Sequence, residues 1–84
     1  MPEITQDELT AAIAFFDGPL IVTKPRWVQE ARVILRQRRK GHSLRRIAKV
    51  LGRALGGMHN PQTTNRRLAW AIDTYRTHSD RRER

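Results

Sequence analysis

Three polar side chains in the last third of the sequence can hydrogen-bond to the edges of nucleic-acid bases. They are Gln62, Asn65 and Arg66. If this segment is helical and Thr64 and Leu68 face inward, all three share the opposite face of the helix. Gln and Asn can read adenine and Arg can read guanine, each through paired hydrogen bonds. We therefore expect these three residues to contact bases.

A second group of residues is suited to bind phosphates. The chain carries 17 Lys and Arg against 8 Asp and Glu, a net charge of +9. Residues 1–23 contain no Lys or Arg, whereas residues 24–53 contain eleven and a single acid, Glu30. Such a balance favours a polyanionic partner that binds beyond residue 23. The expected phosphate contacts are Ser43, Arg45, Arg46, Lys49, Arg53, Thr63 and Arg67.

Four helices are needed to position these residues. We expect them at residues 5–17, 25–40, 43–55 and 60–75, with Thr5, Ser43 and Asn60 as N-caps and Pro25 at a first helical position. Glu8 should reach back to complete a capping box with Thr5. Residues 20–22 are too short a run to assign. With no convincing strand, the sequence predicts one all-α domain over residues 1–78 and a frayed basic tail over 79–84.

Apolar residues at helical spacing predict which side of each helix is buried. In chain order the expected core positions are Leu9, Ala12, Ile13, Phe16, Trp27, Ala31, Ile34, Leu35, Leu44, Ile47, Ala48, Leu51, Leu55, Thr64, Leu68, Ala71, Ile72 and Tyr75. Phe15 and Trp70 fall outside these stripes. We expect Phe15 to be available for contacts with a second subunit, and Trp70 to lie either in the core or at such a contact.

Residues 43–52 resemble the first helix and turn of the helix-turn-helix DNA-binding domains. Ala48 stands where two helices cross closely, and Gly52 stands at the turn. Residues 60–68 look like the start of that family's recognition helix, so the resemblance implies a motif over about 43–76 whose second helix enters the major groove. Residues 53–59 are an addition to the usual short turn. Either the first helix continues to Leu55, or the turn is extended and Met58 fills its apolar position; we favour the second.

Over a longer stretch the chain is similar to the Kor repressors of broad-host-range conjugative plasmids. The similarity rests on Leu9-Thr-Ala-Ala-Ile13, on Gln29-Glu-Ala-Arg-Val-Ile-Leu35 and on the motif that follows. It implies a transcriptional repressor that binds double-stranded DNA as a homodimer. Its site would be a palindromic operator overlapping a promoter, where it would exclude RNA polymerase.

Several other kinds of site are not expected. The chain has no Cys, and its three His residues lack helical metal spacing, so we expect no metal and no cofactor. Asp7 and Glu8 diverge on a helix and Ser43 has no nucleophile partners, which argues against an enzyme. The longest apolar stretch has six residues, which predicts a cytoplasmic protein without a membrane partner. The small size leaves no room for a small-molecule effector domain.

Three other functions are compatible with the same charge. The chain could bind structured RNA, with the helix-turn-helix resemblance a coincidence. It could bend DNA as an architectural or excision factor. It could also bind another protein through its acidic first helix, residues 3–17.

Overall fold

The structure is a computed structural model that describes residues 4–18 and 24–82. It contains four α-helices: α1 (Gln6–Asp17), α2 (Pro25–Arg39), α3 (Leu44–Leu55) and α4 (Pro61–Arg82). No strand occurs in these two segments, so the all-α prediction is confirmed. The unassigned run at 20–22 lies outside the described residues. Residues 79–82, expected in a frayed tail, continue α4 as helix.

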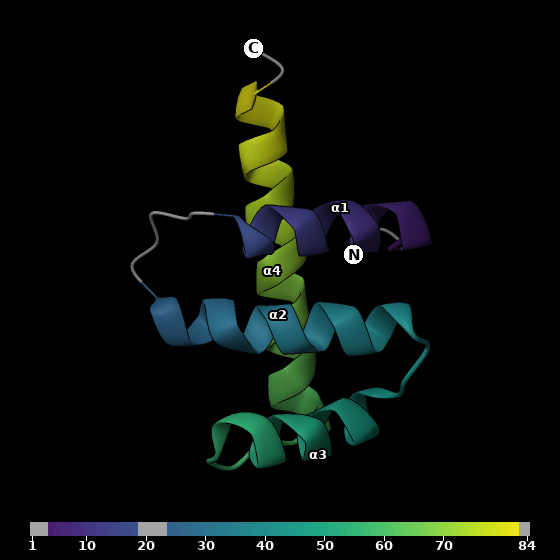
Figure 1. The fold of residues 1–84 in the computed structure, drawn as a ribbon, viewed down its shortest axis with the longest axis vertical. Helices are drawn as coiled ribbons and strands as arrows, with labels where there is room; N and C mark the ends of the chain where they lie inside the picture. The colour runs from purple at the N-terminus through teal and green to yellow at the C-terminus, as the bar shows by residue number, and fades with distance from the viewer. Residues whose placement is uncertain (1–3, 19–23, 83–84) are drawn as a thin grey trace.

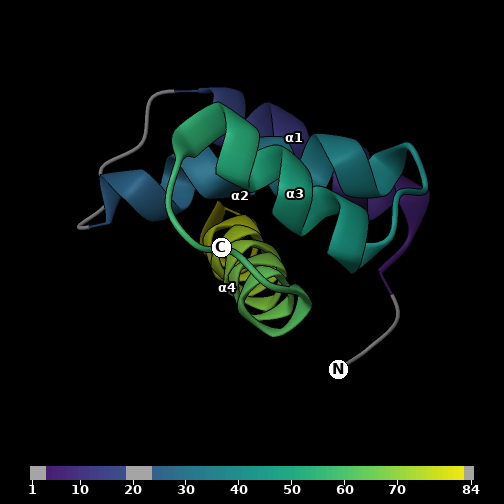
Figure 2. The same ribbon diagram turned by 90° about the horizontal axis from the view of Figure 1, so that it is seen from below.

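The first three helices lie across one side of the long fourth helix. Figure 1 shows α1, α2 and α3 one above the other in front of α4. Figure 2, seen along the long axis, shows α4 nearly end-on with the other three helices on one side of it. The longest dimension of the molecule is 39 Å. One end consists of α3 and the first turns of α4, and the other consists of α1 and the end of α4 (Figure 1).

Three of the four helices begin at the predicted N-cap side chains. Thr5 Oγ1 accepts the Glu8 N–H at 3.1 Å, Ser43 Oγ accepts the Arg46 N–H at 3.2 Å, and Asn60 Oδ1 accepts the Thr63 N–H at 2.8 Å. The remaining helix, α2, begins at Pro25 without a side-chain cap. These caps satisfy backbone donors that have no partner within the helix. Short local sequence patterns therefore determine where these helices begin.

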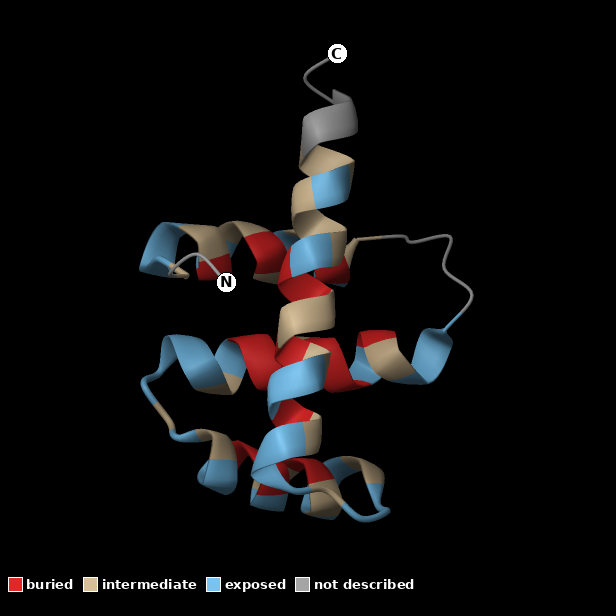
Figure 3. Ribbon diagram, turned by 180° about the vertical axis from the view of Figure 1, so that it is seen from behind, coloured by how far each residue is buried: buried red, intermediate tan, exposed pale blue. Residues whose placement is uncertain are grey.

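The core is formed where the three stacked helices cross α4. Figure 3 shows the buried residues concentrated at these crossings. Among the residues whose burial is described, thirteen apolar residues are buried, and twelve of them belong to the predicted stripes; the exception is Val28. Thr64 is also buried, as predicted. Ile13, Trp27, Leu44, Leu55 and Tyr75 are only partly buried. The main omission from the predicted core is Glu30, a buried carboxylate on α2.

Phe15, which was expected at a subunit contact, and Trp70, which was expected in the core or at such a contact, both pack within the chain. The Phe15 ring lies edge-on to Phe16 and Tyr75, with centroids 5.0 and 5.8 Å apart. The Trp70 ring lies 5.3 Å from that of Trp27 and 5.9 Å from that of Phe16. Such contacts stabilise aromatic pairs beyond simple burial. Phe15 and Trp70 are therefore half-buried by the chain itself and give no argument for a dimer.

The predicted capping box at the start of α1 is only half correct. The Glu8 side chain turns away from Thr5 and accepts two hydrogen bonds of 2.6 Å from Arg76 on α4. These bonds hold the pKa of Glu8 below its ordinary value of 4.5, against an opposing effect of desolvation. The pair joins α1 to α4 at the end of the molecule opposite α3 (Figure 1).

Because the folded state lowers the pKa of Glu8, the pair stabilises the protein above pH 4.5 and this contribution is lost as pH falls through the folded-state pKa. Glu8→Gln should lower the urea midpoint of unfolding at pH 7. Below pH 4.5 the urea midpoints of the variant and of the wild type should converge. Urea titrations between pH 3 and 7 measure this. Asp7→Asn removes the same charge from an exposed neighbour without an ion-pair partner in the described residues, and is the control. If the difference between the urea midpoints of Glu8→Gln and the wild type did not change with pH, it would contradict the assigned Glu8–Arg76 pair.

Candidate nucleic-acid interface

One side of α3 is a row of cations. Arg45, Arg46, Lys49 and Arg53 are all exposed, while Ile47, Ala48 and Leu51 are buried against the core. At 3.6 residues per turn, the four cations fall within an arc of about 100°. We call these four residues the α3 cationic face. Its charge was predicted from the sequence, and the structure places all four side chains in solvent.

Within the part of the chain that the structure describes, no acid pairs with the α3 cationic face. The ion pairs in the described residues are Arg36–Asp17, Arg76–Glu8, Arg67–Glu30 and the His59–Glu30 contact. None of them includes a cation of this face. The sequence contains no Asp or Glu between Glu30 and Asp73. The positive potential at this end of the molecule is therefore available to an external anion.

The three expected base-reading residues share the exposed side of α4. Gln62, Asn65 and Arg66 are exposed, and Thr64 and Leu68 are buried. The three lie within an arc of about 100° on the helix surface. They belong to the first turns of α4, at the same end of the molecule as α3 (Figures 1 and 2). The structure thus brings the base-reading set and the α3 cationic face to one end.

Ser43 and Thr63 have cap contacts as well as the expected phosphate contacts. The Ser43 hydroxyl is exposed, and while it accepts the Arg46 N–H its own proton can still be donated. Thr63 is half-buried and its backbone N–H already donates to Asn60. At Thr63 the side-chain hydroxyl, rather than the backbone N–H, is the group left for a phosphate.

Arg67 is partly buried and forms an ion pair within the protein. Its Nε donates to Glu30 Oε2 at 2.9 Å, and its guanidinium lies 3.7 Å from the centroid of the Trp27 ring. Its side chain is 22% exposed, and that of Glu30 is 4% exposed. A buried carboxylate requires a paired cation, and Arg67 supplies it. Arg67 therefore joins α4 to α2, and its expected contact with a phosphate stays a prediction.

The buried position of Glu30 has a signal in the sequence that the prediction of the core missed. Glu30 is the only acid among residues 24–53. It stands three residues after Trp27 and four before Ile34, which is the spacing of a core position. A lone acid on a predicted apolar stripe indicates a buried ion pair, although the identity of its partner requires the tertiary structure.

The turn between α3 and α4 follows the alternative in which the helix continues to Leu55, and not the extended turn that was favoured. The helix α3 continues through Gly52 to Leu55, so the turn does not start at Gly52. Residues 56–60 make the connection, with Gly56 and Gly57 at φ of 73° and 86°, a conformation that glycine adopts readily. The Met58 side chain is 99% exposed, so the expectation that it fills an apolar turn position is wrong.

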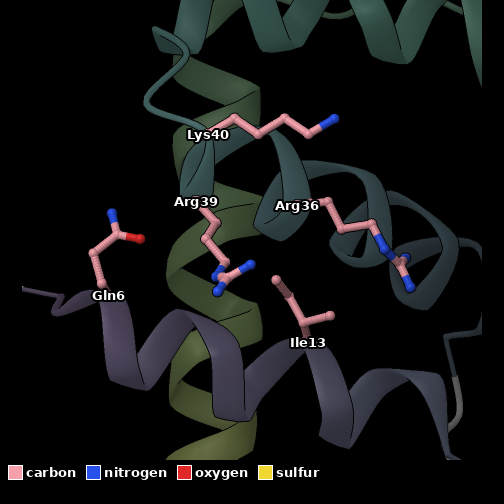
Figure 4. A pocket seen from close by; sticks show the side chains of 5 residues that line it. All are labelled: Gln6, Ile13, Arg36, Arg39 and Lys40. Carbon is pink, nitrogen blue, oxygen red and sulfur yellow. The ribbon is translucent and has the colours of Figure 1, made fainter.

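A hollow of about 440 Å³ lies between α1 and the last turn of α2. It is lined by Gln6, Ile13, Arg36, Arg39 and Lys40 (Figure 4). Two of its cations already have partners, because Arg36 pairs with Asp17 at 2.6 Å and Arg39 Nε donates to Thr10 Oγ1 at 2.8 Å. Its lining offers no pair of groups for acid–base chemistry.

Metal-binding and membrane-spanning features do not occur in the described residues. No group of three or more His, Asp or Glu side chains there is placed to hold a metal ion. None of the described helices has the length and apolar character required to cross a bilayer.

The chain matches no protein-family model, and comparisons with characterised proteins and with solved structures give no match. The resemblances to helix-turn-helix domains and to Kor repressors therefore stay predictions.

Proposed function

We propose that this protein binds double-stranded DNA in a sequence-specific manner and represses transcription as a homodimer on a palindromic operator. One observation carries the proposal. The α3 cationic face has no acidic partner in the described residues, and it lies at the same end as the exposed Gln62, Asn65 and Arg66 of α4.

The two sets of residues supply the two components of specific DNA binding. Cations that contact phosphates provide most of the sequence-independent affinity and position the protein on the duplex. Gln, Asn and Arg side chains at the start of a helix discriminate bases in the major groove. In this proposal α3 binds the backbone while the first turns of α4 enter the groove.

We propose that the protein is a dimer because one chain has only a small number of base-reading side chains. Three residues on one helix start contact only a few base pairs, which is too few for the affinity of a typical operator. Two copies related by a two-fold axis would read a palindrome with two half-sites. A dimer bound across a promoter would repress transcription by excluding RNA polymerase.

The test is selection of bound sequences from a random duplex pool at about 150 mM salt, where contacts to phosphates alone are weakened. A two-fold symmetric consensus is expected. A competition with structured RNA in the same buffer separates the two nucleic acids. If RNA displaces every duplex, or if tight binding enriches no sequence, the proposal fails.

Arg66→Ala should weaken binding to the selected duplex by about 1–3 kcal/mol and relax the preference at one base pair. The physical reason is that the variant cannot form the paired hydrogen bonds to guanine. Titrations against the selected duplex and a scrambled one measure the effect. Arg46→Ala is the matched control, because removing a phosphate-binding cation from α3 should weaken binding to both duplexes equally. If Arg66→Ala weakens binding to the selected and the scrambled duplexes equally, Arg66 does not read a base.

A further inference from the structure

The turn between α3 and α4 contacts α2. The Gly56 carbonyl oxygen accepts a hydrogen bond from Arg26 Nη2 at 3.3 Å and lies 3.0 Å from His59 Nε2. The His59 side chain is 5% exposed, with Nδ1 3.7 Å from Glu30 Oε1. A Cβ on Gly57 would lie 3.3 Å from Arg26 Nη2. Gly56 and His59, on either side of Met58, therefore both contact side chains of α2.

The Met58 side chain extends from this turn into solvent. It is the one large apolar side chain that is exposed in the described part of the chain. The core offers it no contact, although Leu55, three residues earlier, packs against that core. A single exposed apolar residue is ordinary by itself. Here it is presented by a turn that a buried His, a buried Glu and an Arg hold in place.

The charges around Met58 indicate the kind of partner that would contact this side chain. The turn connects the α3 cationic face to the helix that carries Arg66, and Figure 2 shows it at the end of the molecule nearest the viewer. A second copy docking on this end would bring two cationic faces together, at a cost in repulsion. A polyanion with an apolar group within its surface fits both the charges and the side chain.

We propose that Met58 contacts the C5-methyl group of a thymine in the duplex that α4 reads. This inference rests on the proposed function. The thymine methyl is the apolar group that base edges present in the major groove. Met58 is two residues before the cap Asn60, so its Cα lies within about 7 Å of the start of α4. Its flexible, polarisable thioether is suited to an irregular apolar contact.

The experiment measures affinity for the selected duplex and for the same duplex with uracil in place of thymine, which removes only methyl groups. Wild-type protein should bind the uracil duplex about fourfold more weakly for one contacted methyl. Met58→Ala should bind the thymine duplex more weakly than the wild type does and should bind both duplexes equally. Its salt dependence should match that of the wild type, because no phosphate contact changes. Thr77→Ala, exposed on α4 beyond the base-reading residues, should retain the wild-type preference.

The outcomes separate this inference from the proposed function. If wild-type protein binds no duplex, the proposed function fails. If it binds the thymine and uracil duplexes equally, the function stands and the methyl contact is wrong. If Met58→Ala keeps the wild-type preference for thymine, the contact belongs to another residue. If Met58→Ala converts a dimer to a monomer in sedimentation without DNA, Met58 is a subunit contact and the inference is overturned.

Discussion

Replacing Arg45, Arg46 and Lys49 with glutamine should weaken duplex binding by roughly a hundredfold at about 0.15 M salt. Each phosphate contact contributes about 0.9 to the slope of log affinity against log salt, so three contacts should reduce that slope by about 2.7. The fold should be retained, because all three side chains are exposed and none is in an ion pair in the described residues. Titrations across a series of salt concentrations give both quantities.

The matched control removes the same three charges from the hollow between α1 and α2. The triple variant Arg36→Gln, Arg39→Gln, Lys40→Gln has the same net charge as the α3 variant. Two of its cations already have partners within the protein, Asp17 and Thr10. We expect this variant to change the slope by less than about one. If the slope of log affinity against log salt were equal for the two variants, the affinity for DNA would depend on the net charge of the protein and not on the α3 cationic face.

The largest effect on stability should come from Glu30→Ala. This change leaves Arg67 without its carboxylate, beside the Trp27 ring, and removes the group that faces His59. Breaking a fully buried pair costs about 3–5 kcal/mol. Because Arg67 is partly exposed, we expect a smaller decrease, about 2–3 kcal/mol of the free energy of unfolding. Urea denaturation at pH 7 measures it.

A double-mutant cycle separates the ion pair from the packing around it. Arg67→Met keeps an unbranched apolar side chain near Trp27 but removes the charge. The cycle of Glu30→Ala and Arg67→Met should show a coupling energy of about 1–2 kcal/mol. Glu30→Gln, which retains a hydrogen-bond acceptor, should be milder than Glu30→Ala. Independent, additive effects would show that the two side chains do not act as a pair.

Most of the helical architecture followed from local sequence patterns. The caps Thr5, Ser43 and Asn60 each accept a backbone N–H three residues later. Apolar residues at helical spacing identified nearly all of the buried core. These features depend on residues within one or two turns of each other, so a single sequence contains the information.

The errors concern groups whose partners are distant in the sequence. Glu8 pairs with Arg76 instead of the Thr5 backbone, and the pairing of Arg67 with Glu30 was not predicted. The sequence separations in these pairs are 68 and 37 residues. The Gly52 turn was also misplaced, because a glycine can be accommodated within a helix when packing supports it. Continuation of α3 to Leu55 then left Met58 outside the core.

The division of charge was already present in the sequence, since the first 23 residues are acidic and the rest is strongly basic. Only the tertiary structure decided which cations have partners within the protein. It pairs Arg36, Arg67 and Arg76 with carboxylates of the same chain and leaves Arg45, Arg46, Lys49 and Arg53 in solvent. The reason is that helical periodicity is set by neighbouring residues, whereas the partner of a charged side chain depends on which helices pack together.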